Sequence, residues 1–156
     1  MIREPIDKTG WEEGPWHSEP DEMDWVDDAT GLQCLILRMS GGALCGYVGV
    51  KSHHPLFGKN YDDEEVYDLW CHGGLAFSES FAALWSKFEG YWFFGFDCAH
   101  SGDFSPGHAA VLRQIRAGGR HPGDSYRDLA FVKREVEGLA RQLFEPLQAL
   151  AGTLED

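Results

Sequence analysis

A stripe of apolar residues near the C-terminus constrains the fold more than any other feature of the chain. Its members step by three or four positions: Leu129, Val132, Val136, Leu139, Leu143, Leu147 and Leu150. This spacing predicts an amphipathic helix whose apolar side must be buried against another element. Ser125 and Asp128 match a capping box at its start, and Pro146 predicts a kink or an end near Phe144.

Residues 31–50 are predicted to form a β-hairpin with a tight turn at Gly41-Gly42, because glycine reaches positive φ without steric cost. One face then carries Leu35, Leu37, Leu44 and Val48, and the other carries Cys34, Ile36, Cys45 and Tyr47. Both faces are largely apolar, so we expect the hairpin to lie centrally and to be covered on both sides. This register sets Arg38 opposite Cys45 and separates the thiols of Cys34 and Cys45 by about 13 Å, which excludes a disulfide.

Short apolar or aromatic segments are predicted to supply the other elements. Strands are expected at residues 66–72, 75–77 and 91–98, and short helices at residues 78–89 and 108–116. The resulting fold class is α+β, with an antiparallel sheet of about four to five strands and a long C-terminal amphipathic helix packed on one face. Residues 31–156 are expected to form this single domain, because 156 residues bury a core without staples.

The first 30 residues are predicted to form an acidic N-terminal arm. They are rich in acids, prolines and glycines, but they also contain Trp11, Trp16 and Trp25. Disordered tails contain little tryptophan. We therefore expect an irregular arm whose indoles dock on the domain while its carboxylates stay in solvent, with a peptide-like interaction arm as the alternative.

The charge of the chain is strongly acidic and unevenly distributed. The net charge is −13, and residues 1–28 carry ten acids and two bases. This balance disfavours direct nucleic-acid binding, because phosphate contacts come from Lys and Arg. It fits either simple solubility charge or a partner, a host or phage protein, that has a basic surface. The acids expected at such an interaction surface are Glu12, Glu13, Asp27, Asp28, Asp62, Asp63, Glu64 and Glu65.

Two further features of the sequence concern location and basic residues. No apolar run reaches the roughly 18–20 residues that cross a bilayer, and the N-terminus lacks the apolar core of a secretory signal. We therefore expect a cytoplasmic protein with no membrane contact. A basic run opposes the acidic arm in sign, which favours neutralisation within the chain over an anion-docking patch; its members are Arg113, Arg116, Arg120 and Arg127.

Reactive side chains follow two of the predicted strands. His72 precedes Gly73-Gly74, and Asp97, His100 and Asp103 follow the aromatic run at residues 91–94. Because strands of one sheet can align their ends, we expect these four side chains to lie together. Carboxylate and neutral imidazole suit a divalent ion such as zinc or manganese, which could activate water for hydrolysis. The alternative is a structural polar knot, in which Asp97 caps the loop by accepting backbone hydrogen bonds.

The cysteines admit two other readings. Cys71, His72, Cys98 and His100 have the ligand types of a zinc site, but their spacing is not the usual one. Cys98 or Cys71 could also act as a nucleophile activated by a nearby histidine. Free thiols packed in the core are favoured over both.

The motifs taken together resemble a group of small uncharacterised proteins from phages, prophages and bacteria. They occur in the order His72-Gly-Gly-Leu, Gly95-Phe-Asp-Cys-Ala-His with Gly102-Asp103, Pro106-Gly107 and Tyr126-Arg-Asp-Leu, within residues 31–145. The group has no assigned activity, so the resemblance carries over no catalytic residue. It implies a protein of mobile-element character, and small acidic proteins of that origin are sometimes inhibitors of host defence.

Two functions from different classes follow from these observations. The first is a small acidic phage-type accessory protein that binds a host protein, in an anti-defence role. The second is a small metal-dependent hydrolase with its His/Asp site at the strand ends, using His72, Asp97, His100 and Asp103.

Overall fold

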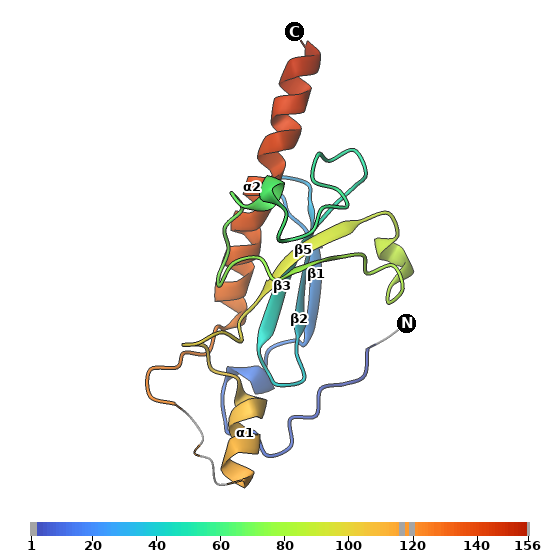
Figure 1. The fold of residues 1–156 in the computed structure, drawn as a ribbon. Coiled ribbons are helices and arrows are strands. Elements are labelled where there is room, and N and C mark those ends of the chain that lie inside the picture. Colours follow the sequence, from blue (N-terminus) through green and yellow to red (C-terminus); the bar gives the residue numbers. More distant parts are fainter. Residues whose placement is uncertain (1–2, 116–117, 119–120, 156) are drawn as a thin grey trace.

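One antiparallel sheet of five strands, with a long helix across one face, forms the described part of the chain (Figure 1). The computed structural model describes residues 3–115, 118 and 121–155. In sheet order β1-β2-β3-β5-β4, the strands are β1 (Glu22–Val26), β2 (Gln33–Arg38), β3 (Leu44–Val50), β5 (Trp92–Asp97) and β4 (Phe77–Glu79). The helices are α1 (Pro106–Gln114) and α2 (Leu129–Glu155). The predicted α+β class with its C-terminal helix is confirmed.

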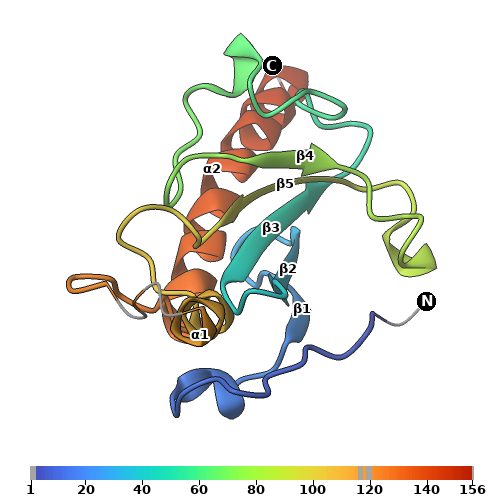
Figure 2. The ribbon, with the colours of Figure 1, turned by 60° about the horizontal axis from the view of Figure 1, so that its bottom comes forward.

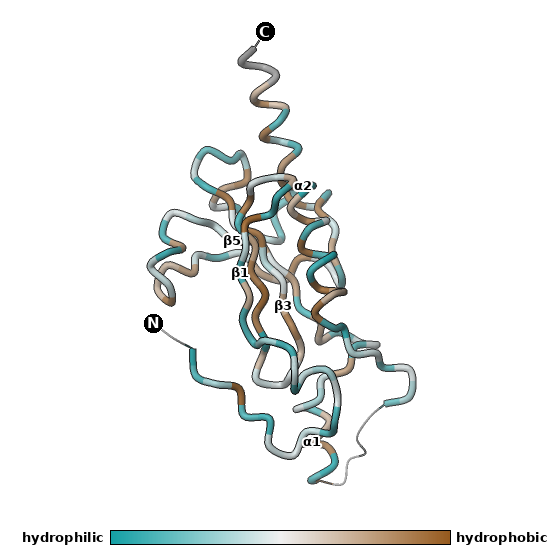
Figure 3. The backbone as a smooth tube through the Cα atoms, turned by 180° about the vertical axis from the view of Figure 1, so that it is seen from behind, coloured by the Kyte–Doolittle hydropathy of each residue, from teal (hydrophilic) through white to brown (hydrophobic). Residues whose placement is uncertain are grey.

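Two apolar layers cover opposite faces of the sheet. The larger layer joins the sheet to α2, as Figure 2 shows, and α2 contributes the predicted stripe: Val132, Val136, Leu139 and Leu143. Gly46 allows this close approach, because a Cβ there would lie 2.5 Å from Cγ2 of Val136. The other face packs against aromatic and apolar side chains of the segment before β5: Phe81, Leu84, Trp85, Phe88 and Tyr91. Figure 3 shows the apolar colouring along both the strands and α2.

The hairpin of β2 and β3 is central, as predicted, but its predicted register is wrong by one residue. Arg38 pairs with Leu44 rather than with Cys45, and Cys34 pairs with Val48. The turn closes with Met39 N–H donating to the Ala43 carbonyl, so it holds one residue more than a two-residue turn needs. A one-residue slip moves side chains to the other face. Leu35 and Leu37 therefore share a face with Cys45 and Tyr47, and all four pack in the smaller apolar layer, on the face opposite α2.

Residues 61–91 contain less regular structure than the sequence predicts. The expected strand at 66–72 is absent, since Glu64–Val66 is a 3₁₀ helix and turns follow it. The expected helix at 78–89 is also wrong, because β4 occupies 77–79 and only Ser86–Phe88 is helical, as a 3₁₀ turn. The apolar side chains of residues 78–89 come from separate turns that pack on the sheet. Their spacing therefore matches a helical period although no α-helix forms.

Both helices differ at their ends from the prediction. The predicted helix at 108–116 is α1, which starts two residues earlier at Pro106, and residue 116 lies outside the described residues. Asp128, not Ser125, caps α2, since its Oδ1 accepts the Phe131 N–H at 2.9 Å. Pro146 does not end α2, which continues to Glu155.

The N-terminal segment is more ordered than the predicted irregular arm. Glu22–Val26 forms β1, an edge strand that pairs with β2. The indole of Trp16 is only 2% exposed and meets the ring of Tyr126 edge-on at 5.0 Å. The docking of indoles on the domain, expected from the sequence, therefore takes place at this residue.

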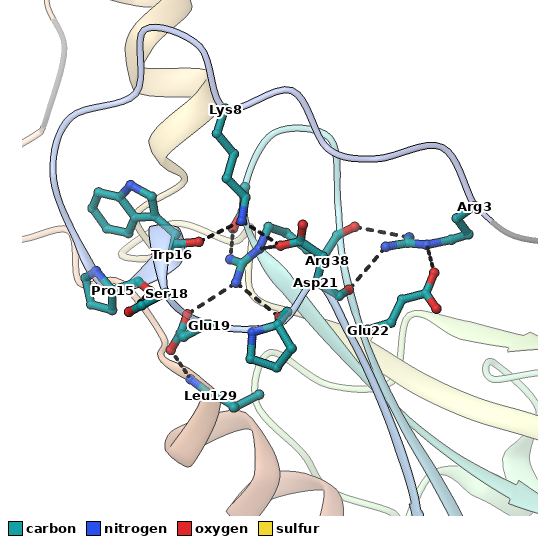
Figure 4. A network of polar contacts seen from close by, with 12 residues as sticks. Arg3, Lys8, Pro15, Trp16, Ser18, Glu19, Asp21, Glu22, Arg38 and Leu129 are labelled. Carbon is teal, nitrogen blue, oxygen red and sulfur yellow. Dashed lines mark hydrogen bonds and ion pairs between the residues drawn. The ribbon is translucent and has the colours of Figure 1, made fainter.

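A buried arginine ties the N-terminal segment to the sheet and to α2 (Figure 4). The side chain of Arg38 is fully buried and donates hydrogen bonds to Asp21 at 2.7 Å and to the Tyr126 hydroxyl at 2.8 Å. Glu19 accepts from Arg38 through Oε1 and from the Leu129 N–H through Oε2, at 3.3 and 2.8 Å. These bonds compensate the burial of the charge and fix the start of α2.

Candidate functional site

The four candidate ligands lie together at the end of β5. His72 comes from a turn beyond Cys71, while Asp97 ends β5 and Asp103 follows in the next turn. His72 Nε2 lies 2.9 Å from both carboxylate oxygens of Asp103, and its ring centroid lies 6.4 Å from that of His100. We call these four residues, together with Arg127, the polar cluster.

The carboxylate of Asp103 is the centre of the polar cluster. Its side chain is 1% exposed, and it also accepts from Arg127 Nε at 2.8 Å and from the His100 backbone N–H at 3.1 Å. Burial alone would raise the pKa of Asp103, but the hydrogen bonds from Arg127 and His72 outweigh burial and lower this pKa. The oxygen atoms of an ionised carboxylate are thus already used within the chain.

Asp97 and His100 form a second, more exposed pair. Asp97 Oδ1 accepts the Ala99 backbone N–H at 3.0 Å and lies 3.1 Å from His100 Nε2. Asp97 therefore caps the loop, as the structural alternative proposed. Within residues 3–115, 118 and 121–155, no group of three His, Cys, Asp or Glu side chains is placed to hold one metal ion. In the same residues, every buried side-chain nitrogen and oxygen has a hydrogen-bond partner.

The cysteines do not extend the polar cluster into a reactive site. All four are buried and free. Burial raises the pKa of Cys71 to about 12. The pKa of Cys98 is also raised, first by burial and then by the charge of Asp103. Both thiols are therefore protonated at neutral pH, which opposes metal ligation and nucleophilic attack alike.

An open cleft of about 550 Å³ lies next to the polar cluster. Its walls come from the loop at 99–105, from α1 and from residues 121–124, and they include three histidines: His100, His108 and His121. Asp103 is the buried acid in this wall, and its carboxylate is already bonded to His72 and Arg127. The cleft thus offers solvent access but no free buried acid for catalysis.

The eight acids of the predicted interaction surface have different environments. Asp27 is 8% exposed and accepts from both the backbone N–H and the hydroxyl of Thr30, so it stabilises a turn. Glu12 pairs with Arg113 at 3.4 Å, which neutralises part of the arm as the basic run predicts. The remaining six are exposed or half-buried: Glu13, Asp28, Asp62, Asp63, Glu64 and Glu65.

The basic run does not form a single patch in the described residues. Arg113 reaches Glu12 and Arg127 reaches Asp103, and both contacts are ion pairs within the chain. The other two members, Arg116 and Arg120, lie outside the described residues.

Residues 61–70, which we call the acidic aromatic segment, combine these acids with exposed rings. The exposed fractions are 46% for Tyr61, 68% for Tyr67 and 67% for Trp70. The sequence pattern placed Tyr67 and Trp70 in a strand and gave no sign of their exposure. The signal that could have identified this surface is the insertion of acids among the rings, at Asp62–Glu65 and again at Asp68.

The side chain of Gln142, on α2, fixes the end of the acidic aromatic segment. Its Oε1 accepts the Trp70 backbone N–H at 2.7 Å, and its Nε2 donates to the Trp70 carbonyl at 2.8 Å. These two hydrogen bonds hold the main chain of Trp70 in place while its indole remains in solvent. An exposed tryptophan on a fixed backbone is pre-organised for contact with another molecule.

Comparison of the chain with family models, curated proteins and solved structures finds no match. Function is therefore argued from the geometry described above. In the described residues, none of the helices is long and apolar enough to cross a membrane.

Proposed function

We propose that this chain is a small acidic accessory protein that acts by binding a basic surface of another protein. The observation that carries the proposal is the acidic aromatic segment, where Tyr67 and Trp70 are about two-thirds exposed among carboxylates. Tryptophan and tyrosine are enriched among the residues that dominate binding energy at protein interfaces. Carboxylates around them would select a basic partner and speed its association.

The polar cluster supports the hydrolase alternative less well. A metal-dependent hydrolase needs a ligand set with open coordination positions. The Asp103 carboxylate instead accepts hydrogen bonds from His72, Arg127 and the His100 main chain. Hydrogen bonds of this kind are typical of a polar cluster with a structural role.

The resemblance to phage and prophage proteins suggests the class of protein to which the proposed partner belongs. Such a partner would be a host protein, and its basic surface could be one that normally holds nucleic acid. Covering that surface with a protein of net charge −13 would be an anti-defence mechanism that needs no catalysis.

Charge reversal tests this proposal. The partner would be captured with the tagged full chain, identified by mass spectrometry, purified, and titrated by calorimetry. The test variant is Asp62→Lys/Glu64→Lys/Glu65→Lys. The matched control, Glu13→Lys/Asp28→Lys/Glu89→Lys, makes the same charge change at exposed acids elsewhere.

We expect the test variant to weaken binding at least about tenfold and the control to change it about threefold or less. The proposal is wrong if the two variants bind the partner equally well. It is also wrong if the control loses more affinity, because the arm would then be the binding surface.

A further inference from the structure

A groove of about 410 Å³ separates the acidic aromatic segment from α2. Figures 1 and 2 both show residues around 50–70 beside the C-terminal half of α2, whose last turns extend beyond the sheet. The apolar lining comes from both walls: Pro55, Leu56, Leu69, Pro146 and Ala149. The polar lining is Gln142 and three acids, Glu65, Asp68 and Glu145.

Hydrogen bonds hold both walls of this groove in place. Gln142 binds the main chain of Trp70, as described above. His54, 3% exposed, donates from Nε2 to the Leu143 carbonyl at 2.7 Å, and its Nδ1 accepts the Leu56 N–H at 2.9 Å. The hydrogen bonds of Gln142 to Trp70 and of His54 to Leu143 join residues 54–70 to α2, so the groove is present before any ligand binds. A preformed site avoids the free-energy cost of ordering loops upon binding.

The charged side chains that line the groove are all acidic. The described residues that line it include three acids and no basic side chain. One of the three acids, Glu65, is paired: the exposed ammonium of Lys59 lies 3.4 Å from its Oε2. An apolar floor below a rim of carboxylates complements a side chain with a methylene stem and a cationic end, which is the form of Arg and Lys.

We infer that this groove holds an Arg- or Lys-bearing apolar segment of the basic partner. The stem of the basic side chain packs on Leu56 and Leu69, and its cation lies among the carboxylates of Glu65, Asp68 and Glu145. Tyr67 and Trp70 flank the lining residues Asp68 and Leu69 in sequence, and their exposed rings can receive a further cation of the same segment through cation–π contact. This inference rests on the proposed function and names the chemistry of its partner. A second copy of this chain is a poor occupant, because its net charge is also −13.

The probe is a synthetic amphipathic peptide with leucine and arginine on one face, titrated into the full chain while tryptophan fluorescence is recorded. A second peptide carries citrulline at every arginine, which keeps the shape and removes the charge. We expect the citrulline peptide to bind at least about tenfold more weakly. Equal binding of the two peptides, or no binding of either, would overturn the inference.

Neutral variants of the groove complete the test. Asp68→Asn/Glu145→Gln removes two lining charges at exposed positions with little change of shape, and Asp28→Asn/Glu89→Gln is the matched control. We expect at least about a tenfold loss of arginine-peptide affinity for the first pair and less than about twofold for the second. Circular dichroism melting would show that both variants are folded. Unchanged affinity of the first variant would overturn the inference.

The failure of this inference differs from the failure of the proposed function. If reversal of Asp62, Glu64 and Glu65 weakens binding of the purified partner but Asp68→Asn/Glu145→Gln does not, the groove is not the site and the acidic surface remains. If neither change affects the partner, the proposed function itself is wrong.

Discussion

The polar cluster and the acidic aromatic segment contain similar residue types but use their charge in opposite ways. In the polar cluster, the Asp103 side chain is 1% exposed and its carboxylate accepts hydrogen bonds from His72, Arg127 and the His100 N–H. In the acidic aromatic segment, carboxylates face solvent beside rings that are about two-thirds exposed at Tyr67 and Trp70. Residue types that suit catalysis can thus have all their hydrogen bonds within the chain. The carboxylates and rings that remain exposed are the ones available to a partner.

The largest expected effect tests whether the buried cysteines, two of which lie beside the polar cluster in sequence, are reactive. Burial raises the pKa of Cys71 from 9.0 to about 12, which lowers its thiolate fraction about 1000-fold. We expect an aromatic disulfide reagent to modify each native thiol at least about 100-fold more slowly than in denaturant, since even Cys45 has its pKa raised to about 11. The control is the same reaction in guanidinium chloride, where all four thiols should react. One rapidly modified thiol in the native protein would contradict the structural role of this region.

A second prediction compares one buried acid with one exposed acid. Asp103→Ala leaves Arg127 and His72 without their acceptor, and we expect it to lower the free energy of unfolding by roughly 2–3 kcal/mol. Asp62→Ala should change it by less than about 0.5 kcal/mol. Urea unfolding followed by circular dichroism measures both. A functional site often reduces stability, so an Asp103→Ala protein that is as stable as the wild type, or more stable, would restore the case for a catalytic role.

The sequence predicts the parts of this fold that depend on local pattern. The apolar hairpin is right, and the stripe on α2 is right as far as Leu143, because burial repeats there at the period of the element. Leu150, the last member of the stripe, is 44% exposed. The hairpin register is wrong, because a single extra residue in the 39–43 turn changes which residues of β2 share a face with which residues of β3. The strand expected at 66–72 is wrong for another reason: Tyr67 and Trp70 have strand propensity, but their exposure shows that no sheet packs against them.

The sequence predicts part of the candidate site but not the contacts that complete it. His72 approaches Asp103 as expected, but not because two strand ends align, since the strand expected at 66–72 is absent and His72 lies in a turn. The bond from Arg127 was not foreseen, because the sequence placed this residue in a basic run. The groove was also not foreseen, since its two walls are joined by Trp70 and Gln142, far apart in the sequence. Such contacts depend on tertiary packing, which no local pattern encodes.

Acid should weaken the groove wall that His54 holds and the polar cluster around Asp103 in different pH ranges. Burial lowers the pKa of His54, the residue that joins Leu56 to α2. The unfolded chain therefore binds this proton more readily than the folded chain. Its contribution to stability is complete above the unfolded pKa of about 6.5 and decreases as the pH falls below that value, with a slope of at most about 1.4 kcal/mol per pH unit.

The pKa of Asp103 is lowered from 3.8, so its contribution is lost only at still lower pH. We expect urea unfolding between pH 8 and pH 5 to show decreasing stability, and His54→Gln to flatten that dependence. Arginine-peptide affinity should fall in the same range, because the groove wall depends on His54. An unchanged slope in the variant would assign the acid sensitivity to another group.

The smallest expected effect separates two neighbouring acids of the predicted interaction surface. Asp27→Ala removes the acceptor for the backbone N–H and hydroxyl of Thr30, and we expect a loss of about 1 kcal/mol in unfolding free energy. Asp28 is exposed, so Asp28→Ala should change stability by less than about 0.5 kcal/mol. Neither substitution should alter partner affinity, because neither residue lines the groove. Weaker partner binding by Asp28→Ala alone would show that the N-terminal acids also belong to the interface, and the contrast drawn between the two regions would then extend to the arm.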